Sequence, residues 1–159
     1  MIKASLIIPT YNEAKNIPLL VAEIFQHLDK ERVDLEIIIV DDNSPDQTAM
    51  VAENLAAEYP IRVVKRAGKL GLGGAVIEGF KHSQRDYLGV MDGDLSHDPV
   101  ILNDLILSLA EYDITLGSRF VEGSFIEKWN WWRKAISGSG VFLTRVLTGV
   151  QDPLSGYFF

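Results

Sequence analysis

Residues 36–42, EIIIVDD, form an almost unbroken apolar run that ends in two aspartates. Because side chains alternate between the two faces of a strand, a strand without polar positions is covered on both faces, as in parallel sheets. Four other runs have this character, and each of the first four in chain order is followed by a helical pattern. This alternation predicts one α/β domain with a doubly wound, mostly parallel open sheet and helices on both faces. The other runs are SLIIPT (5–10), IRVVKR (61–66), YLGVMDGD (87–94) and DITLGSR (113–119).

The predicted helices show their buried faces in the spacing of their apolar residues. The first helix repeats apolar residues at the spacing of a single helix face, which assigns them to the core. The helix after the fourth strand is predicted to start with Asp98 as its N-cap and Pro99 in its first turn. The apolar positions are Ile17, Leu20, Val21, Ile24, Phe25 and Leu28 in the first helix, and Leu102, Leu105, Ile106 and Leu109 in the later one.

Length and composition limit the number of domains and the classes of partner. The chain has 159 residues, 47% of them hydrophobic, which suits one compact core better than two. A formal net charge of −7 argues against nucleic acid as a partner, which would require a basic face. There is no cysteine, so disulfides and thiolate sites are excluded. No apolar run approaches the roughly 18 residues of a membrane span.

Polar clusters stand at the predicted carboxyl end of every strand. In an open parallel sheet, ligands bind in the crevice outside these ends, so the clusters are expected to converge on one site. The alternative for any single cluster is ordinary turn and cap chemistry, since Asn, Asp, Gly and Ser favour both. The clusters are PTYNE (9–13), DDNSPDQT (41–48), KRAGKLGLGG (65–74), DGDLSHD (92–98) and GSR (117–119).

Two of these clusters each allow a structural and a binding interpretation. In 41–48, Asp46 or Ser44 could cap the helix ahead of Thr48, or Asp42 could accept hydrogen bonds from a base or ribose. In 65–74, the glycines permit close approach of a ligand and Lys69 could face a phosphate.

A dehydrogenase is disfavoured by the glycine pattern in residues 71–76. Val76 stands where the dinucleotide fingerprint needs a small residue, and the pattern follows the third strand instead of the first.

Asp92 and Asp94 are one residue apart at the end of the fourth strand. Two anions held together repel unless a cation lies between them, and carboxylate oxygens suit Mg²⁺ or Mn²⁺ bound to a diphosphate. Such an ion would neutralise a departing nucleoside diphosphate. His97 is expected to cap or to support these carboxylates, since a lone imidazole suits a hard ion poorly.

The alternative enzyme is a phosphatase of the haloacid dehalogenase type, in which one of the two aspartates is the nucleophile. That pattern normally follows the first strand and ends in Thr or Val, whereas here it follows the fourth and continues to Ser96.

The motifs, taken in order and followed by Trp132, Arg133 and Ser137, resemble the family 2 glycosyltransferases, and within them the dolichol-phosphate mannose synthase group. The resemblance runs from Ile2 to Phe159. It implies a Rossmann-like, glycosyltransferase A-type sheet, a nucleotide sugar such as GDP-mannose, Mg²⁺ or Mn²⁺, and a polyprenyl or dolichyl phosphate acceptor. Donor binding would fall to Pro9, Tyr11, Glu13, Val40, Asp42, Lys69, Asp92, Gly93 and Asp94; metal binding to Asp92, Asp94 and Ser96; acceptor phosphate binding to Arg119, Arg133 and Ser137; and catalysis to Asp92, Asp94 and Arg119.

The sequence departs at three places from the pattern of the family that it resembles. Gly93 replaces a commoner alanine, Ser96 replaces a glutamine ligand of some relatives, and Phe158 stands where many have arginine. Because relatives continue past this point, we expect residues 1–159 to be a single catalytic domain that lacks its C-terminal part. A fragment of this kind could also act as a nucleotide-binding module without turnover.

Residues 127–150 are predicted to lie on the acceptor side and to face a membrane. They contain three tryptophans and several basic residues, which suit a bilayer interface and anionic lipid, although the tryptophans could instead pack against the domain. The expected location is the cytoplasmic face of a membrane, with a membrane-spanning domain or subunit outside this chain.

Overall fold

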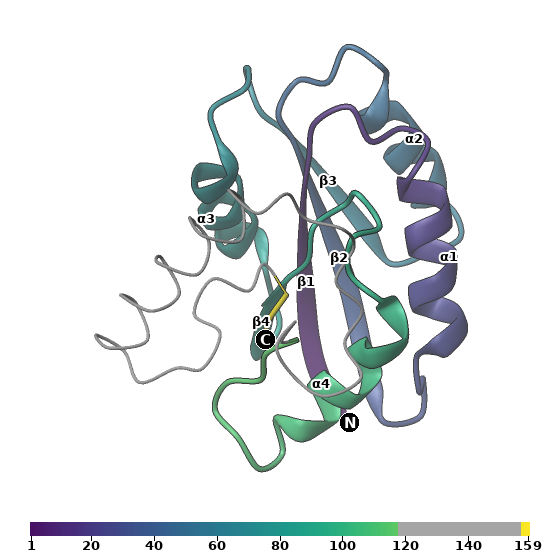
Figure 1. Cartoon of the computed structure of the whole chain (residues 1–159), viewed down its shortest axis with the longest axis vertical. Helices are drawn as coiled ribbons and strands as arrows, with labels where there is room; N and C mark the ends of the chain where they lie inside the picture. The colour runs from purple at the N-terminus through teal and green to yellow at the C-terminus, as the bar shows by residue number, and fades with distance from the viewer. Residues whose placement is uncertain (118–156) are drawn as a thin grey trace, which may run out of the picture.

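The computed structural model describes residues 1–117 and 157–159, which fold around a parallel sheet (Figure 1). Its strands are β1 (Ile2–Thr10), β2 (Val33–Asp41), β3 (Ile61–Lys65) and β4 (Tyr87–Val90), in the order β3-β2-β1-β4. The helices are α1 (Ile17–His27), α2 (Thr48–Leu55), α3 (Leu72–His82), the short 3₁₀ turn η1 (Pro99–Ile101) and α4 (Leu102–Ser108). The predicted α/β class with parallel strands is confirmed.

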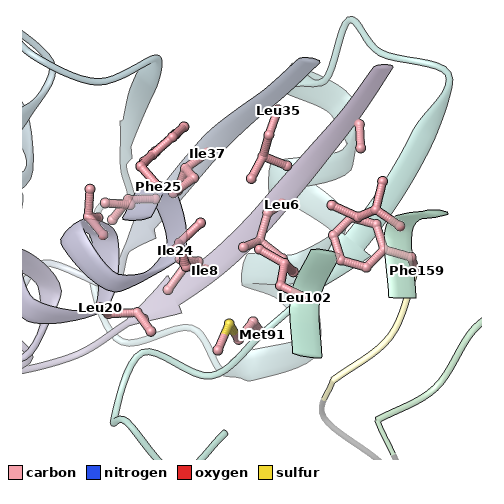
Figure 2. Packing of buried hydrophobic residues seen from close by; sticks show 14 of the residues in the cluster. Leu6, Ile8, Leu20, Ile24, Phe25, Leu35, Ile37, Met91, Leu102 and Phe159 are labelled. Atoms are coloured by element: carbon pink, nitrogen blue, oxygen red, sulfur yellow. The ribbon is translucent and has the colours of Figure 1, made fainter. Parts of the chain in front are cut away.

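Helices cover both faces of the sheet, as the apolar strands require. In β1, Leu6 and Ile8 pack on the face that carries α1, α2 and α4, while Ile7 packs on the face that carries α3. The same alternation runs through β2, where Ile37 belongs to the first cluster and Ile38 to the second. Figure 2 shows the larger cluster, in which Leu20, Ile24 and Phe25 of α1 meet Leu6, Ile8, Leu35, Ile37, Met91, Leu102 and Phe159.

The predicted buried faces of two helices are confirmed, with small shifts at the ends. Helix α1 buries five of the six expected residues, and Leu28 lies one residue beyond its end and is partly buried. Asp98 does cap: its carboxylate accepts a hydrogen bond from the Val100 amide at 2.9 Å. The segment after Asp98 forms the 3₁₀ turn η1 before it enters α4. Leu105 in this helix is only partly buried.

The fifth predicted strand is present only as isolated bridges in the described part of the chain. Phe158 bridges Val90 at the end of β4 and Leu116, antiparallel to both. The chain at Leu116 therefore runs in the same direction as β4. Gly117 follows Leu116 on the side of the carboxyl edge, as predicted. Arg119 lies outside the described residues.

No helix within residues 1–117 or 157–159 combines the length and hydropathy needed to cross a bilayer.

Gly79 provides a test of how closely α3 packs on β1. A Cβ at Gly79 would lie 2.5 Å from Cγ2 of Ile7, a buried side chain with little room to move. Gly79→Ala is expected to lower the free energy of unfolding by about 1–3 kcal/mol through overpacking. The measurement is urea denaturation followed by circular dichroism.

Gly73→Ala is the matched control, because it lies in the same helix and a Cβ there meets nothing within 4 Å. It should be neutral or stabilising by up to about 1 kcal/mol. Equal stability of the two variants would contradict the close packing.

Candidate active site

The carboxyl ends of the strands bring together the polar loops predicted from the sequence. Strand order reverses between β1 and β4, because the chain winds outward from β1 to β3 and then crosses back to β4. This switch point is where open α/β sheets bind ligands. The loops after β1 and β4 flank it, and a Cβ at Gly93 would lie 3.4 Å from Cγ2 of Thr10.

Asp41 and Asp42 face opposite sides of the sheet because they are neighbours at a strand end. Asp41 turns to the α1 side, where Oδ1 accepts from Thr10 Oγ1 at 3.1 Å and from Ser44 Oγ at 2.5 Å. Ser44 Oγ in turn accepts from the Asn12 amide at 3.0 Å. Asp41 thus ties the loop after β1 to the loop after β2, and it is 2% exposed.

A second tie between these loops runs through Asp46 and Thr48. Asp46 accepts from the Thr48 amide and hydroxyl and, through its other oxygen, from the Ala14 amide at 3.0 Å. Asp46 is exposed, and its slight desolvation alone would raise its pKa, but the hydrogen bonds from Thr48 and Ala14 outweigh this and lower the pKa below its ordinary value. Thr48 Oγ1 accepts from the Glu13 amide at 2.9 Å. Asp46 therefore satisfies the first backbone amide of α2, as the capping interpretation expected, although the N-cap position itself is Gln47 and has no side-chain hydrogen bond.

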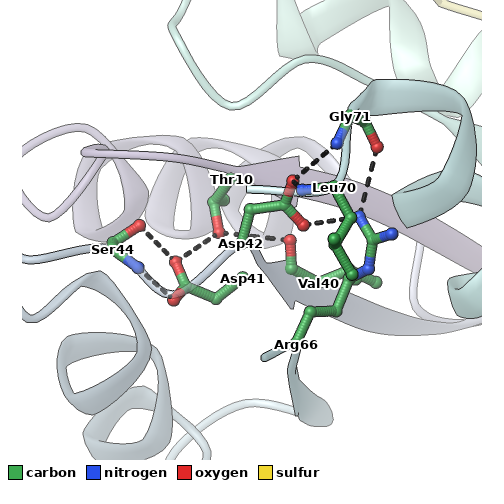
Figure 3. A network of polar contacts seen from close by, with 8 residues as sticks. All are labelled: Thr10, Val40, Asp41, Asp42, Ser44, Arg66, Leu70 and Gly71. Carbon is green, nitrogen blue, oxygen red and sulfur yellow. Dashed lines mark hydrogen bonds and ion pairs between the residues drawn. The ribbon is translucent and has the colours of Figure 1, made fainter. Parts of the chain in front are cut away.

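Asp42 is the centre of a buried ion pair on the α3 side (Figure 3). Its Oδ1 pairs with Nη1 of Arg66 at 2.5 Å, and its Oδ2 accepts from the amides of Leu70 and Gly71 at 2.9 and 3.1 Å. Arg66 also donates to the Gly71 carbonyl at 3.1 Å. The side chains of Asp42 and Arg66 are only 8% and 11% exposed. Asp42 therefore holds the loop before α3 against the end of β2.

Two residues predicted to bind the sugar donor, one in the loop after β1 and one in the loop before α3, contact each other. Nζ of Lys69 lies 4.0 Å from the centroid of the Tyr11 ring, a cation–π contact. Tyr11 is 37% exposed, whereas Val40 is completely buried and could touch a ligand only if neighbouring groups moved. Pro9 follows the part of β1 that pairs with β4, so its missing N–H interrupts no ladder on that side.

The DGD loop presents two carboxylates in different environments. Asp92 is partly buried and lies 3.1 Å from His97, through Oδ2 and Nε2. Asp94 is exposed and accepts from the Ser96 amide at 2.9 Å, which forms a tight turn with Leu95 at φ 62°. The expectation that His97 supports the carboxylates agrees with this contact.

Gly93 is buried between the two aspartates, and a side chain there would be closely confined. A Cβ would lie 3.3 Å from Ile8, closer than most such contacts, and 3.4 and 3.5 Å from Thr10 and Ile17, so an alanine would require Ile8 to shift by a few tenths of an ångström.

The oxygen atoms available in the DGD loop suit a hard divalent ion that also binds a substrate phosphate. Within the described residues, no three His, Asp or Glu side chains gather as a preformed metal site. Mg²⁺ and Mn²⁺ are commonly held by one or two carboxylates plus substrate phosphates, which the exposed Asp94 and half-buried Asp92 match. Ser96 is exposed beside them and could add an oxygen.

Backbone strain gathers at the same edge of the sheet. Four non-glycine residues in the described part of the chain have positive φ, and all four lie in loops after β1, β2 or β4. Such conformations cost free energy and gather at functional sites. They are Asn12, Asn43, Gln47 and Leu95.

The structure brings the residues predicted to bind the nucleotide sugar, which come from four loops, to one edge of the sheet. Not every predicted site residue lies in the described part of the chain. Arg119, Arg133 and Ser137, and the segment 127–150, lie outside the described residues. Arg66 was not predicted as a site residue. Its position directly after an apolar strand and before a glycine-rich loop was a signal that could have identified it. The partner that makes it important, Asp42, is distant in sequence.

The chain resembles known proteins in sequence and solved structures in fold. The chain is 40% identical to the dolichol-phosphate mannosyltransferase of Pyrococcus furiosus over 98% of its length, and 38% identical to that of Saccharomyces cerevisiae over 99%. Among solved structures it resembles the mannosyltransferase PcManGT of Pyrobaculum calidifontis, in complex with GDP-Man and Mn²⁺. That match has a TM-score of 0.59 and 25% identity, and covers 68% of this chain and 32% of the other.

The arrangement of the sheet is that of the glycosyltransferases with an A-type fold. More narrowly, the chain belongs to glycosyl transferase family 2, whose sequence profile matches residues 5–154. The matches give no support to a phosphatase. The chain covers 45% and 60% of the lengths of the two mannosyltransferases, so it spans about half of the relatives it matches.

Arg66→Met tests the buried pair that holds the loop before α3. The change leaves the Asp42 carboxylate buried without its cation, so a loss of about 3 kcal/mol in the free energy of unfolding is expected. Chemical denaturation at constant pH measures it.

Lys65→Met is the matched control, since its pair with Glu53 is about half exposed and should contribute less than about 1 kcal/mol. Adding Asp42→Asn to Arg66→Met should recover part of the loss, because the buried charge is then removed. If Arg66→Met were as stable as Lys65→Met, the pair would not hold the loop.

Proposed function

We propose that this chain carries the catalytic part of an inverting glycosyltransferase that moves a mannosyl group from GDP-mannose to a polyprenyl or dolichyl phosphate. The main support is its identity of 38–40% to proteins named dolichol-phosphate mannosyltransferase, over nearly its whole length. The convergence of the β1, β2, β3 and β4 loops on one switch point supplies the site.

The described loops support a donor half of the site. Tyr11 and Lys69 would flank the nucleoside, with a ring face and an ammonium on adjacent loops. Asp42, Pro9, Glu13 and Val40 would complete this wall, with Asp42 also fixing the amides of Leu70 and Gly71. Asp92, Gly93 and Asp94 would lie against the ribose and the diphosphate.

A divalent ion, Mg²⁺ or Mn²⁺, held by Asp92 and Asp94 with Ser96 nearby, would supply positive charge to the diphosphate. The structure of PcManGT with GDP-Man and Mn²⁺ supports an ion of this kind. Among this chain's own groups, Lys69 would add positive charge at the same edge.

The reaction needs little proton transfer, because a lipid phosphate is already ionised at neutral pH. A phosphate oxygen attacks the anomeric carbon, a new C–O bond forms, and the bond to the β-phosphate oxygen breaks. GDP leaves with that electron pair, and the attack from the opposite side inverts the carbon. The protein therefore contributes positioning and charge neutralisation.

The acceptor half rests on residues outside the described part. Arg119, Arg133 and Ser137 would receive the lipid phosphate, and residues 127–150 would lie against the membrane surface. Arg119 follows Gly117 by two positions, and Gly117 lies beside the bridge next to β4. We place the protein at the cytoplasmic face of a membrane, with a spanning domain or subunit beyond this chain.

Asp94→Asn tests the donor site. Loss of the carboxylate should reduce mannosyl transfer by about 100- to 1,000-fold while the fold is kept, because charge on the leaving diphosphate is no longer neutralised. The assay incubates protein, Mn²⁺, a panel of nucleotide sugars and a short polyprenyl phosphate, with the glycolipid identified by mass spectrometry. Excess chelator should abolish transfer by the parent.

Asp86→Asn is the control, because Asp86 is an exposed carboxylate just before β4, at the opposite edge of the sheet. Near-normal transfer by Asp94→Asn, or by the parent in chelator, would refute the metal site. Phosphate release from simple esters, with Asp92 trapped by beryllium fluoride, would indicate a phosphatase. GDP binding without transfer would indicate a binding module.

Arg133→Ala tests the acceptor side separately. It should weaken use of the lipid phosphate by about 1.5 to 3 kcal/mol, the range for a hydrogen bond to a charged group, with GDP affinity nearly unchanged. Arg133→Lys should also be impaired, because a point charge does not replace a two-pronged guanidinium. Acceptor kinetics and GDP calorimetry measure the two effects. An equal loss of GDP binding would move Arg133 to the donor site or the fold.

A further inference from the structure

A line of side-chain contacts connects Asp92 to the last residues of the chain. Nε2 of His97 lies 3.1 Å from Oδ2 of Asp92. The imidazole is the more buried partner, with 11% of its side chain exposed against 37% for Asp92. Asp92 is therefore contacted through one oxygen by the more buried imidazole.

The other contact of His97 is an aromatic ring from far along the sequence. The ring centroids of His97 and Tyr157 lie 5.2 Å apart at an angle of 46°. Tyr157 is 1% exposed, and burial, followed by the nearby Asp98 charge, raises the pKa of its phenol. A neutral, buried ring thus forms one wall of the space that His97 occupies.

Tyr157 is itself fixed by backbone pairing on both sides. Its carbonyl accepts from the Gly117 amide at 2.9 Å, and Phe158 exchanges two hydrogen bonds with Val90 at the end of β4. A Cβ at Gly117 would lie 2.8 Å from Cδ1 of Tyr157, so this ring fits only beside a glycine. The line of contacts therefore runs from Gly117 to Tyr157, His97 and Asp92.

We propose that His97 is a positioning residue, which holds the Asp92 carboxylate by a hydrogen bond and couples its orientation to the seating of Tyr157. The last torsion of an aspartate is broad, so an unsupported carboxylate samples many orientations. A buried donor selects one of them, as groups that orient metal ligands do elsewhere. The inference rests on the proposed function only for the ligand that Asp92 binds.

Three variants at position 97 separate hydrogen bonding from packing. His97→Phe keeps a ring against Tyr157 and removes the donor, whereas His97→Gln keeps an amide nitrogen near the place of Nε2 and removes the ring. His97→Ala removes both. For calorimetric affinity of GDP with Mn²⁺, the expected order is parent, Gln, Phe, with a loss for Phe of about 10- to 100-fold.

For thermal unfolding, His97→Phe should be more stable than His97→Gln, the reverse of their order in GDP affinity, and His97→Ala should be lowest in both measurements. His82→Phe is the control: His82 pairs with Glu78 on α3 and should leave GDP affinity unchanged. A purely packing role predicts that Phe binds GDP as well as the parent and better than Gln. That result would overturn the proposal.

The coupling to Tyr157 has a separate test in Gly117→Ala, which forces the ring to move. It should weaken GDP–Mn²⁺ binding, and its effect should be largely absent when His97→Phe is already present, because both changes act on one line of contacts. Additive effects of the two changes would overturn the coupling.

A measurement without ligand keeps this inference apart from the proposed function. The two-bond ¹H–¹⁵N spectrum of the ligand-free protein should show a proton on Nε2 of His97, and a proton on Nδ1 alone would overturn the hydrogen bond. Failure of the parent to transfer mannose would refute the proposed function while this spectrum still decides the role of His97.

Discussion

The parallel pairing of β1 with β2 is the constraint on which the rest of the structure depends. Nine residue pairs are in register, from Ile2 with Val33 to Thr10 with Asp41. Both strands are apolar on both faces, so a shift by one residue would exchange every buried contact with α1 for one with α3. The register therefore fixes which polar groups stand together at the carboxyl edge, beginning with Thr10 and Asp41.

Alternation at the strand end gives the two adjacent aspartates different tasks. Asp41 continues the face of Ile37 and Ile39 and bonds the loops after β1 and β2 to each other. Asp42 continues the face of Ile38 and takes Arg66 and the loop before α3. Three loops are therefore held in one arrangement by two neighbouring carboxylates, which reduces the entropy lost when a ligand is bound.

The site has a fixed side and an exposed side. The groups that tie the loops, such as Asp41 and Arg66, are buried, while Tyr11 and Asp94 are exposed. Between them lies Asp92, half-buried and contacted by His97 from within. Strained loop residues and exposed polar side chains therefore lie at the edge where a charged ligand would bind. The stability of the fold comes from the hydrophobic core beneath that edge.

The sequence alone was sufficient for the class of fold and for the edge of the sheet at which the polar loops gather. Apolar runs and helical spacing are local patterns, so they predicted four parallel strands, the α1 core face and the Asp98 cap, and a parallel sheet forces the strand ends to one edge. The fifth strand was less well predicted. Its partner, Phe158, lies 42 positions after Leu116, and no local pattern shows that pairing.

Only the tertiary structure decided which partner each polar group takes. From the sequence of DDNSPDQT, its first two aspartates could each have met a ligand or a loop; in the structure Asp41 bonds to Thr10 and Ser44, and Asp42 pairs with Arg66. The contacts of His97 with Asp92 and Tyr157 likewise join groups that are 5 and 60 positions away. Residue types and spacing record which groups are available, whereas the choice among them depends on strand order, register and the face to which each side chain points.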